Sequence, residues 1–260
     1  MWDLVLLVVV TLHATVHAYV HDAQWKALVY LLPFPFTAAA LAVGKPIDAS
    51  NIWSLLILLI YTHGVRWLYV NARVPIYLAI AIGLLACAAL GLVLAPVLGS
   101  LQHEYSAPAI FWISCALVLA TSLTIRSLMP TRDEPGQRTP APLWAKLPTI
   151  AIVIFLLILL KKQLGGFITA FPMVGVVAAY EARHSLWTMS RQVSVILPVL
   201  ATMLIVVHLA QSTLGWSLPL SIAMGWMVYL PLIMLCTPVL RSRILTRRER
   251  VEREAMPPAD

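Results

Sequence analysis

The feature that most constrains this chain is a succession of long apolar runs. A run of about 20 residues lets an α-helix cross a hydrocarbon core of about 30 Å. We predict nine such spans, over residues 2–20, 26–43, 52–72, 75–98, 106–129, 145–161, 165–182, 186–209 and 216–239. Only 11% of the residues are charged, whereas soluble domains carry roughly 25%. We therefore expect an all-α, polytopic protein embedded in a lipid bilayer.

The basic residues are unevenly placed along the chain. Part of the net charge of +7 comes from an arginine-rich stretch after the last run, which is typical of a cytoplasmic tail facing anionic lipid rather than of a nucleic-acid site. With nine spans and that tail inside, fifteen of the eighteen lysines and arginines lie on the cytoplasmic side, and Lys45, Lys161 and Lys162 lie outside. This bias predicts an outer N-terminus and a cytoplasmic C-terminus.

The polar, proline-containing segment 130–143 is the clearest internal boundary. We predict a first transmembrane repeat over 1–100, a connecting helix with a cytoplasmic linker over 101–144, a second repeat over 145–240 and a basic tail over 241–260. Because one span separates two groups of four, the groups enter the membrane in opposite orientations. Such inverted repeats are common among secondary transporters.

A Phe-Pro pattern occurs once in each predicted repeat. The first copy runs from Pro33 through Phe34, Pro35, Phe36 and Thr37; the second runs from Phe171 through Pro172, Met173 and Val174 to Gly175. Proline inside a helix removes a hydrogen bond and clashes with the preceding turn, at a cost of about 3 kcal/mol or more. Pro35 follows Lys26 by about 13 Å of helix and Pro172 follows Lys162 by about 15 Å, at roughly 1.5 Å per residue.

Both prolines are therefore expected near the bilayer midplane, approached from opposite faces. A pair of interrupted helices in corresponding places indicates a transporter binding site. We predict that the residues around both breaks bind the substrate, namely Phe34, Pro35, Phe36, Thr37, Phe171, Pro172, Met173 and Gly175.

The stretch Leu160-Lys161-Lys162-Gln163-Leu164-Gly165-Gly166-Phe167-Ile168-Thr169-Ala170-Phe171-Pro172-Met173 resembles the GlpM-like group of small bacterial inner-membrane proteins. In the first half, only Phe34-Pro35 and the small residues after it fit that pattern. The resemblance implies a four-helix unit, duplicated in this chain, and a bacterial inner membrane. It leaves the reaction open.

Four basic residues are candidates for binding an anionic solute. Lys161 and Lys162 either snorkel to the outer headgroups or form an electropositive mouth. Arg66 and Arg191 either end their helices or flank a central cavity, where guanidinium groups bind carboxylate or phosphate.

Titratable residues inside the runs suggest proton coupling. Glu181 either pairs with Arg183 or Arg191 at the interface or takes up a proton, and His63 is a second coupling candidate.

His13, His17 and His21 recur every four residues. This stripe is interpreted first as packed on neighbouring helices, then as a proton relay, and last as a path for a transition metal. The three cysteines, Cys87, Cys115 and Cys236, fall inside apolar runs and are expected in the core. No cofactor or resident metal is expected.

We therefore predict a secondary transporter for a small organic solute, either anionic or amphipathic and lipid-linked, coupled to protons. One alternative is a membrane enzyme acting on lipid, with His63, Arg66, Glu181 and Arg191 as its polar site. Another is a non-catalytic accessory subunit of an envelope assembly. Whether the chain forms a homo-oligomer stays open.

Overall fold

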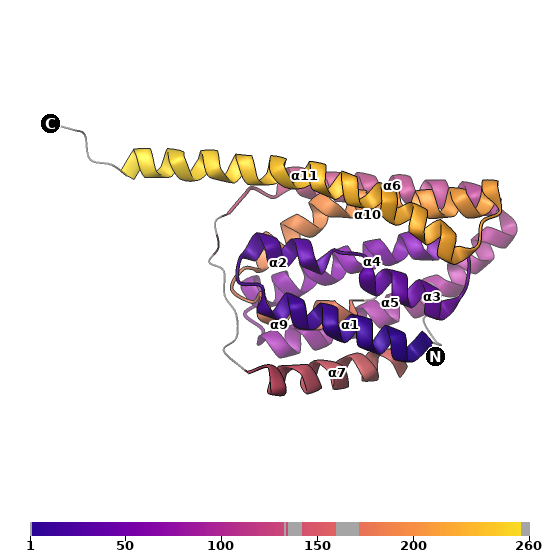
Figure 1. Ribbon diagram of the computed structural model, residues 1–260, viewed down its shortest axis with the longest axis horizontal. Helices are drawn as coiled ribbons and strands as arrows, with labels where there is room; N and C mark the ends of the chain where they lie inside the picture. Colours follow the sequence, from indigo (N-terminus) through magenta and orange to yellow (C-terminus); the bar gives the residue numbers. More distant parts are fainter. Residues whose placement is uncertain (1, 133, 135–141, 160–171, 256–260) are drawn as a thin grey trace.

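The computed structural model describes residues 2–132, 134, 142–159 and 172–255, and this part of the chain is helical without any strand (Figure 1). Six of its helices are long and apolar enough to cross a membrane: Trp25–Val43, Ala49–Asn71, Ile76–Glu104, Ala107–Leu128, Leu186–Leu214 and Leu218–Cys236. This confirms the all-α class and supports a membrane protein. The count of nine spans is not confirmed, because the helices described within 2–20, 145–161 and 165–182 fall short of this length.

The helices follow one another along the chain with short connections. In order they are α1 (Trp2–Tyr19), α2 (Ala23–Tyr30), α3 (Phe34–Val43), α4 (Ala49–Arg66), the π-helical turn η1 (Trp67–Asn71), α5 (Ile76–Glu104), α6 (Ala107–Leu128), α7 (Leu143–Leu159), α9 (Met173–Glu181), α10 (Leu186–Leu214) and α11 (Leu218–Ala255). Helix α11 continues past residue 240, so the predicted basic tail begins as part of this helix.

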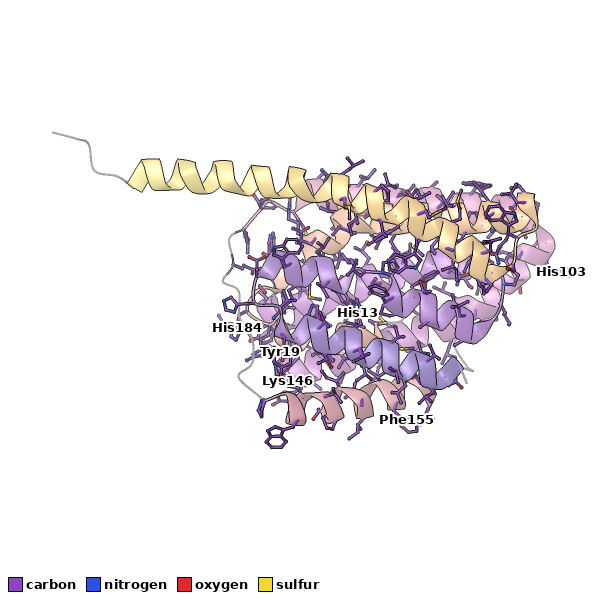
Figure 2. The ribbon with its side chains drawn as sticks, in the orientation of Figure 1. His13, Tyr19, His103, Lys146, Phe155 and His184 are labelled. Atoms are coloured by element: carbon purple, nitrogen blue, oxygen red, sulfur yellow. The ribbon has the colours of Figure 1, made fainter. Side chains whose placement is uncertain are left out.

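Helices α4 and α10 form the centre of the molecule. They pack against each other, α5 packs on α4, α11 packs on α10, and α6 contacts both central helices. Helix α1 packs on α3, α7 and α9 at the opposite side of the ribbon from α11 (Figure 1). The helices run between two ends of the bundle, with Lys146 and His184 at one end and His103 at the other (Figure 2).

Tryptophans near the start of both central helices bind to α6 or to the chain just after it. Trp53 Nε1 in α4 donates to Ser114 Oγ at 2.9 Å, and Trp187 Nε1 in α10 donates to the Pro130 carbonyl at 2.9 Å. Helix α6 is therefore attached to the two central helices near its middle and just beyond its end.

The first Phe-Pro segment interrupts a helix, and Pro172 of the second directly precedes one. Helix α2 ends at Tyr30 and α3 begins at Phe34, with Pro33 at φ −79° and ψ 26° between them. Pro172 has φ −74° and ψ 53°, which is not helical, and α9 begins at the next residue.

Other prolines behave differently. Pro96, Pro148 and Pro198 lie inside α5, α7 and α10. At Pro198 the carbonyl that loses its helical partner belongs to Ser194, and Ser122 Oγ of α6 donates to that oxygen at 2.7 Å. A neighbouring helix thus replaces the missing bond, as membrane interiors require.

Candidate functional site

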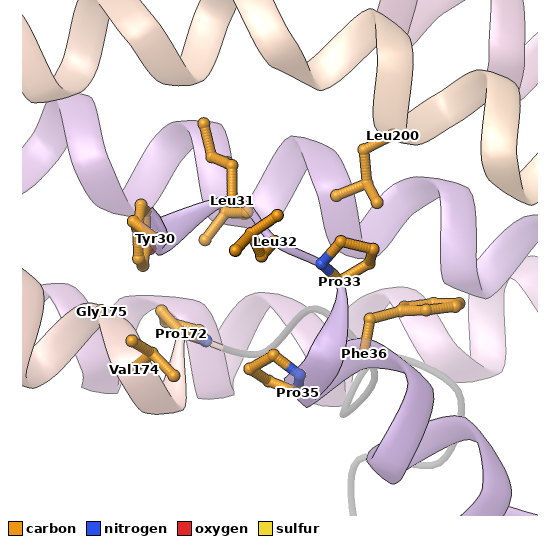
Figure 3. Close-up of a pocket in the computed structure, with 11 residues that line it drawn as sticks. Tyr30, Leu31, Leu32, Pro33, Pro35, Phe36, Pro172, Val174, Gly175 and Leu200 are labelled. Carbon is orange, nitrogen blue, oxygen red and sulfur yellow. The ribbon is translucent and has the colours of Figure 1, made fainter. Parts of the chain in front are cut away.

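A pocket of about 50 Å³ lies where the two Phe-Pro segments meet (Figure 3). The break between α2 and α3 forms one wall and the start of α9 forms another, while α4 and α10 each contribute a leucine. The lining residues are Tyr30, Leu31, Leu32, Pro33, Pro35, Phe36, Leu58, Pro172, Val174, Gly175 and Leu200.

Gly175 allows the walls of this pocket to approach closely. A Cβ at this position would lie 2.8 Å from Pro172 Cβ, 2.8 Å from Tyr61 Cε1 and 2.9 Å from the Tyr30 hydroxyl. Any side chain would therefore force the two tyrosine rings away from α9. The glycine predicted at the site is required by packing.

Two buried phenols lie beside the pocket. Tyr30 and Tyr61 are 6% and 1% exposed, and neither hydroxyl has a hydrogen-bond partner in the described part of the chain. The ring of His17, from α1, meets the Tyr30 ring edge-on with centroids 6.0 Å apart. Between α2 and α3, by contrast, the backbone carbonyl of Leu31 has a hydrogen-bond partner, because Tyr229 Oη donates to it at 2.9 Å.

Four of the predicted substrate-binding residues, Pro35, Phe36, Pro172 and Gly175, line the pocket. Phe171, together with Lys161 and Lys162, lies outside the described residues.

The other three predicted residues near the breaks do not line the pocket. Phe34 is 47% exposed and packs on Trp226 with ring centroids 4.8 Å apart. Thr37 Oγ1 accepts a hydrogen bond of 2.8 Å from Trp226 Nε1. Met173 is buried but points elsewhere in the core. The helical turn that begins at Phe34 explains this result, because consecutive residues of a helix face different directions.

Arg66 and Arg191, predicted either to end their helices or to flank a central cavity, are not among the residues that line this pocket. Arg66 lies over the Trp187 ring at 4.7 Å, and Arg191 Nε donates to the Met129 carbonyl at 3.0 Å. Along their helices, these arginines are about 12 and 13 Å from Leu58 and Leu200, at about 1.5 Å per residue.

His63 is also placed away from the pocket lining. Its Nε2 atom lies 3.1 Å from Ser194 Oγ, which joins α4 to α10. The four residues predicted as a lipid-enzyme site are His63, Arg66, Glu181 and Arg191. Their contacts include Ser194 for His63, Trp187 for Arg66, Lys146 for Glu181 and Met129 for Arg191.

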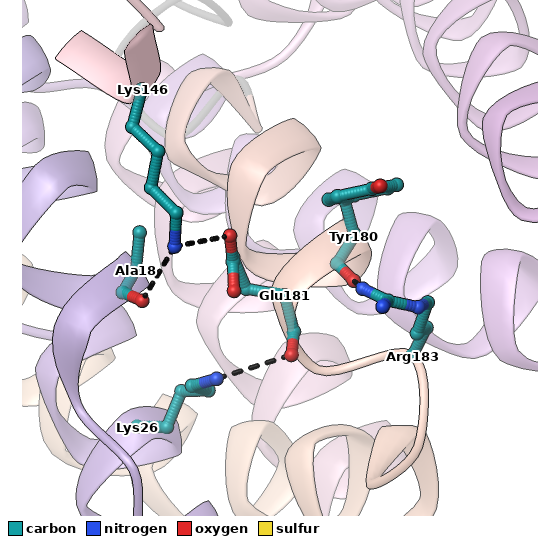
Figure 4. Close-up of polar contacts among 6 residues, drawn as sticks. All are labelled: Ala18, Lys26, Lys146, Tyr180, Glu181 and Arg183. Carbon is teal, nitrogen blue, oxygen red and sulfur yellow. Dashed lines mark hydrogen bonds and ion pairs between the residues drawn. The ribbon is translucent and has the colours of Figure 1, made fainter. Parts of the chain in front are cut away.

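Glu181 takes part in a buried polar cluster at the end of α9 (Figure 4). Lys146 Nζ lies 3.0 Å from Glu181 Oε1 and also donates to the Ala18 carbonyl at 3.4 Å. Lys26 Nζ donates to the backbone carbonyl of Glu181 at 3.1 Å. The cluster thus joins α1 and α2 to α7 and α9.

The ion pair with Lys146 was not predicted. The sequence suggested Arg183 or Arg191 as the partner, because both are near Glu181 in the chain. The Arg183 guanidinium instead donates to the Tyr180 carbonyl at 2.9 Å. Lys146 is 35 positions away and is brought to Glu181 by the packing of α7 on α1 and α9.

The histidine stripe is divided by the end of α1. His13 and His17 are buried and contact the rings of Phe34 and Tyr30, both with centroids 6.0 Å apart. His21 lies beyond the last residue of α1 and is exposed. No three potential metal ligands gather anywhere in the described ranges. The geometry agrees with a stripe packed on the interrupted helix.

Sequence reasoning missed much of the pocket wall. Leu58 and Leu200 carry no local signal, because leucines occur throughout α4 and α10. Tyr30 could have been singled out from the sequence, because it is an aromatic residue with a polar hydroxyl that lies shortly before Pro33 and Pro35 inside an apolar run.

Fold and pocket together define a class: in its described part this is a helical protein with six helices apolar enough to cross a membrane, and the break between α2 and α3 meets the start of α9 at a pocket. Comparisons with models of protein families, with curated proteins and with solved structures give no match to the chain. The resemblance to the GlpM-like group stays a prediction.

Proposed function

We propose that this protein is a secondary transporter whose substrate site is the pocket between the two Phe-Pro segments. The observation that carries the proposal is the meeting of Pro33 and Pro35 with Pro172 around one pocket. These prolines are far apart in sequence; Pro33 lies between α2 and α3, and Pro172 directly precedes α9. Transporters bind their substrates at such interruptions, where repeats meet.

The order of the helices supports an inverted repeat. On this proposal α1, α2 with α3, α4 and α5 correspond to α7, α9 with the segment before it, α10 and α11. The pair α4 and α5 packs as the pair α10 and α11 does, and α6 contacts both central helices. With α6, the fifth of the nine predicted spans, as the single span between the repeats, the two halves cross the membrane in opposite senses.

On this proposal, access to the pocket changes as the two halves move relative to each other, as in the rocking motion of transporters with repeats.

The Glu181 cluster is suited to closing one end. Ala18 and Lys26 belong to the first half, whereas Lys146 and Glu181 belong to the second. Glu181 lies about 9 Å along α9 from Gly175, at about 1.5 Å per residue. Opening the pocket toward this end would separate Lys146 from the Ala18 carbonyl and Lys26 from the Glu181 backbone carbonyl. Protonation of the Glu181 carboxylate would weaken its ion pair with Lys146. Glu181 is therefore our first candidate for proton coupling.

Accessibility from the two membrane faces tests the proposal. In a background with Cys87, Cys115 and Cys236 replaced by alanine, Leu58→Cys places a thiol in the pocket, and Leu59→Cys places one in the buried core one position away. Right-side-out and inside-out vesicles are treated with a membrane-impermeant thiosulfonate. We expect Leu58→Cys to react from both faces and Leu59→Cys to stay unmodified. Protection of Leu58→Cys from both faces would refute a transport route through this pocket.

A further inference from the structure

Two arginines from distant parts of the chain meet at one tryptophan. Arg66 is the last residue of α4, and Arg132 lies in the segment after α6. Both guanidinium groups lie over the ring of Trp187, at 4.7 Å and 3.6 Å from its centroid. Neither arginine forms an ion pair with another described residue, and the Nε atom of Arg66 is buried without a hydrogen-bond partner. Buried donors of this kind are nearly always satisfied, so the site lacks an acceptor.

The charged groups around this pair leave its positive charge only partly balanced. The charge of Arg132 acts unfavourably on the Arg66 guanidinium, and the charge of Glu134 acts favourably. The Glu134 carboxylate, however, accepts a hydrogen bond of 2.7 Å from the backbone N–H of Thr188. It therefore occupies the N-terminal turn of α10, where the helix dipole favours a negative charge. Arg191 already donates to a backbone carbonyl of the segment after α6.

The pair lies where two apolar helices end. Helices α4 and α6 are both long and apolar enough to cross a membrane, and they pack against each other. Trp67 directly follows Arg66 and is 56% exposed, and Leu128 at the end of α6 is 73% exposed. In a bilayer such side chains contact lipid, while arginine and tryptophan side chains at the ends of spans reach the level of the headgroups.

We propose that Arg66 and Arg132 together bind the phosphate of an anionic phospholipid. The guanidinium group presents a planar fork of N–H donors that matches phosphate geometry. Trp187 holds the two groups in place through cation–π contacts. A free phosphate would make the same polar contacts, but the exposed apolar side chains beside the pair favour a phosphate that carries acyl chains. The inference goes beyond the proposed function, because it concerns a site other than the pocket and does not require transport.

Native mass spectrometry of the full chain in detergent tests the inference by measuring the bound lipid. The probes are dioleoyl phosphatidylglycerol, which is anionic, and dioleoyl phosphatidylcholine, which has the same acyl chains and no net charge. We expect the native chain to bind phosphatidylglycerol more tightly. Arg66→Gln and Arg132→Gln should each weaken that binding about fivefold, as expected for one basic residue near an anionic headgroup. Binding of phosphatidylcholine should not change.

Two further variants separate a specific site from general attraction of anions. Lys45→Gln removes the same charge from an exposed position at the other end of α4, and should leave binding of phosphatidylglycerol unchanged. Arg66→Lys keeps the charge but loses the planar fork, so it should also weaken binding. Arg132 is exposed, so Arg132→Gln remains informative if Arg66→Gln folds poorly.

Each other result overturns the inference. Equal binding of the two lipids by the native chain would refute a preference for an anionic headgroup. An equal loss of binding in Lys45→Gln and Arg132→Gln would refute a site at the two arginines. Displacement of the lipid by inorganic phosphate at the same concentration would show that the site takes free phosphate rather than phospholipid.

Discussion

At the scale of single residues, Gly175 is a position beside the pocket where the packing leaves no room for a side chain. Gly175→Ala would place a methyl group under 3.0 Å from Pro172, Tyr61 and Tyr30. Overpacking of this kind costs about 1–3 kcal/mol. We expect a lower thermal midpoint of unfolding in detergent, measured by tryptophan fluorescence, together with lower reactivity of Leu58→Cys.

Gly99→Ala is the matched control for this prediction. Gly99 lies inside α5 and an added Cβ would meet nothing within 4 Å. Alanine favours a helix over glycine by about 1 kcal/mol, so the control should melt at the same temperature or higher. If Gly175→Ala and Gly99→Ala have the same thermal midpoint, the residues around Gly175 can move to accept a methyl group and the prediction is wrong.

The buried pair of Lys146 and Glu181 gives a second prediction at this scale. Both side chains are less than one-tenth exposed, and removing one partner of a buried pair costs about 3–5 kcal/mol. We expect Lys146→Met to destabilise strongly and the double variant Lys146→Met with Glu181→Met to recover part of that loss. A double-mutant cycle from urea unfolding measures the coupling.

Lys45→Met, at an exposed position outside the helices, controls for loss of a lysine. If Lys146→Met and Lys45→Met unfold alike, the pair contributes nothing to the contact between the halves.

The sequence alone could show that Glu181 is an isolated carboxylate near apolar residues. It could not show its partner, because the packing of α7 on α1 and α9 determines which lysine reaches it.

At the scale of helices, Ser122 explains how α10 stays continuous through Pro198. Its hydroxyl donates to the Ser194 carbonyl at 2.7 Å. Removing the donor leaves a buried acceptor unsatisfied, at a cost of about 1–3 kcal/mol. We expect Ser122→Ala to destabilise the protein by this amount in a thermal unfolding assay.

The Pro198→Ala background makes this prediction specific. There the backbone N–H of residue 198 can bond to the Ser194 carbonyl, so Ser122→Ala should cost much less. Ser127→Ala, an exposed serine in the same helix, should have little effect in either background. The same cost of Ser122→Ala with and without Pro198 would refute the explanation.

Prolines also show what could be predicted about the helices. The Phe-Pro pairs were expected to interrupt their helices; the structure places a break at Pro33, and for the second pair it shows that α9 begins directly after Pro172. Sequence spacing could not say that Pro198 would be tolerated, because the compensating hydroxyl comes from α6, 76 positions away. Nor could it say that Phe34 would face Trp226, since the first turn of α3 sets that direction.

At the scale of the whole molecule, the two halves contact each other through two kinds of surface. Apolar packing of α4 on α10 forms the centre, and hydrogen bonds such as Ser190 Oγ to the Thr62 carbonyl, at 3.1 Å, fix their relative position. The polar cluster around Glu181 joins the halves at one end. A transporter needs one contact that persists and another that opens, and these two surfaces are suited to the separate roles.

The proposed inverted arrangement predicts where each end of the chain lies. In Figure 1 the start of α1 and the end of α11 lie toward opposite ends of the molecule. An odd number of spans with a basic C-terminal segment places that segment in the cytoplasm and the N-terminus outside. In a cysteine-free background, Lys45→Cys should react with an impermeant maleimide on intact cells. Arg132→Cys, on the linker after α6, should react only after the cells are permeabilised.

A fluorescent protein fused after residue 260 and an epitope placed before residue 1 complete this test. We expect fluorescence from the C-terminal fusion, since folding of that reporter requires the cytoplasm, and antibody binding to the N-terminal epitope on intact cells. If both ends lie on one side, the number of spans is even and the two halves share one orientation. The Phe-Pro segments would then approach the pocket from the same face, and the pseudo-symmetry on which the transporter proposal depends would be lost.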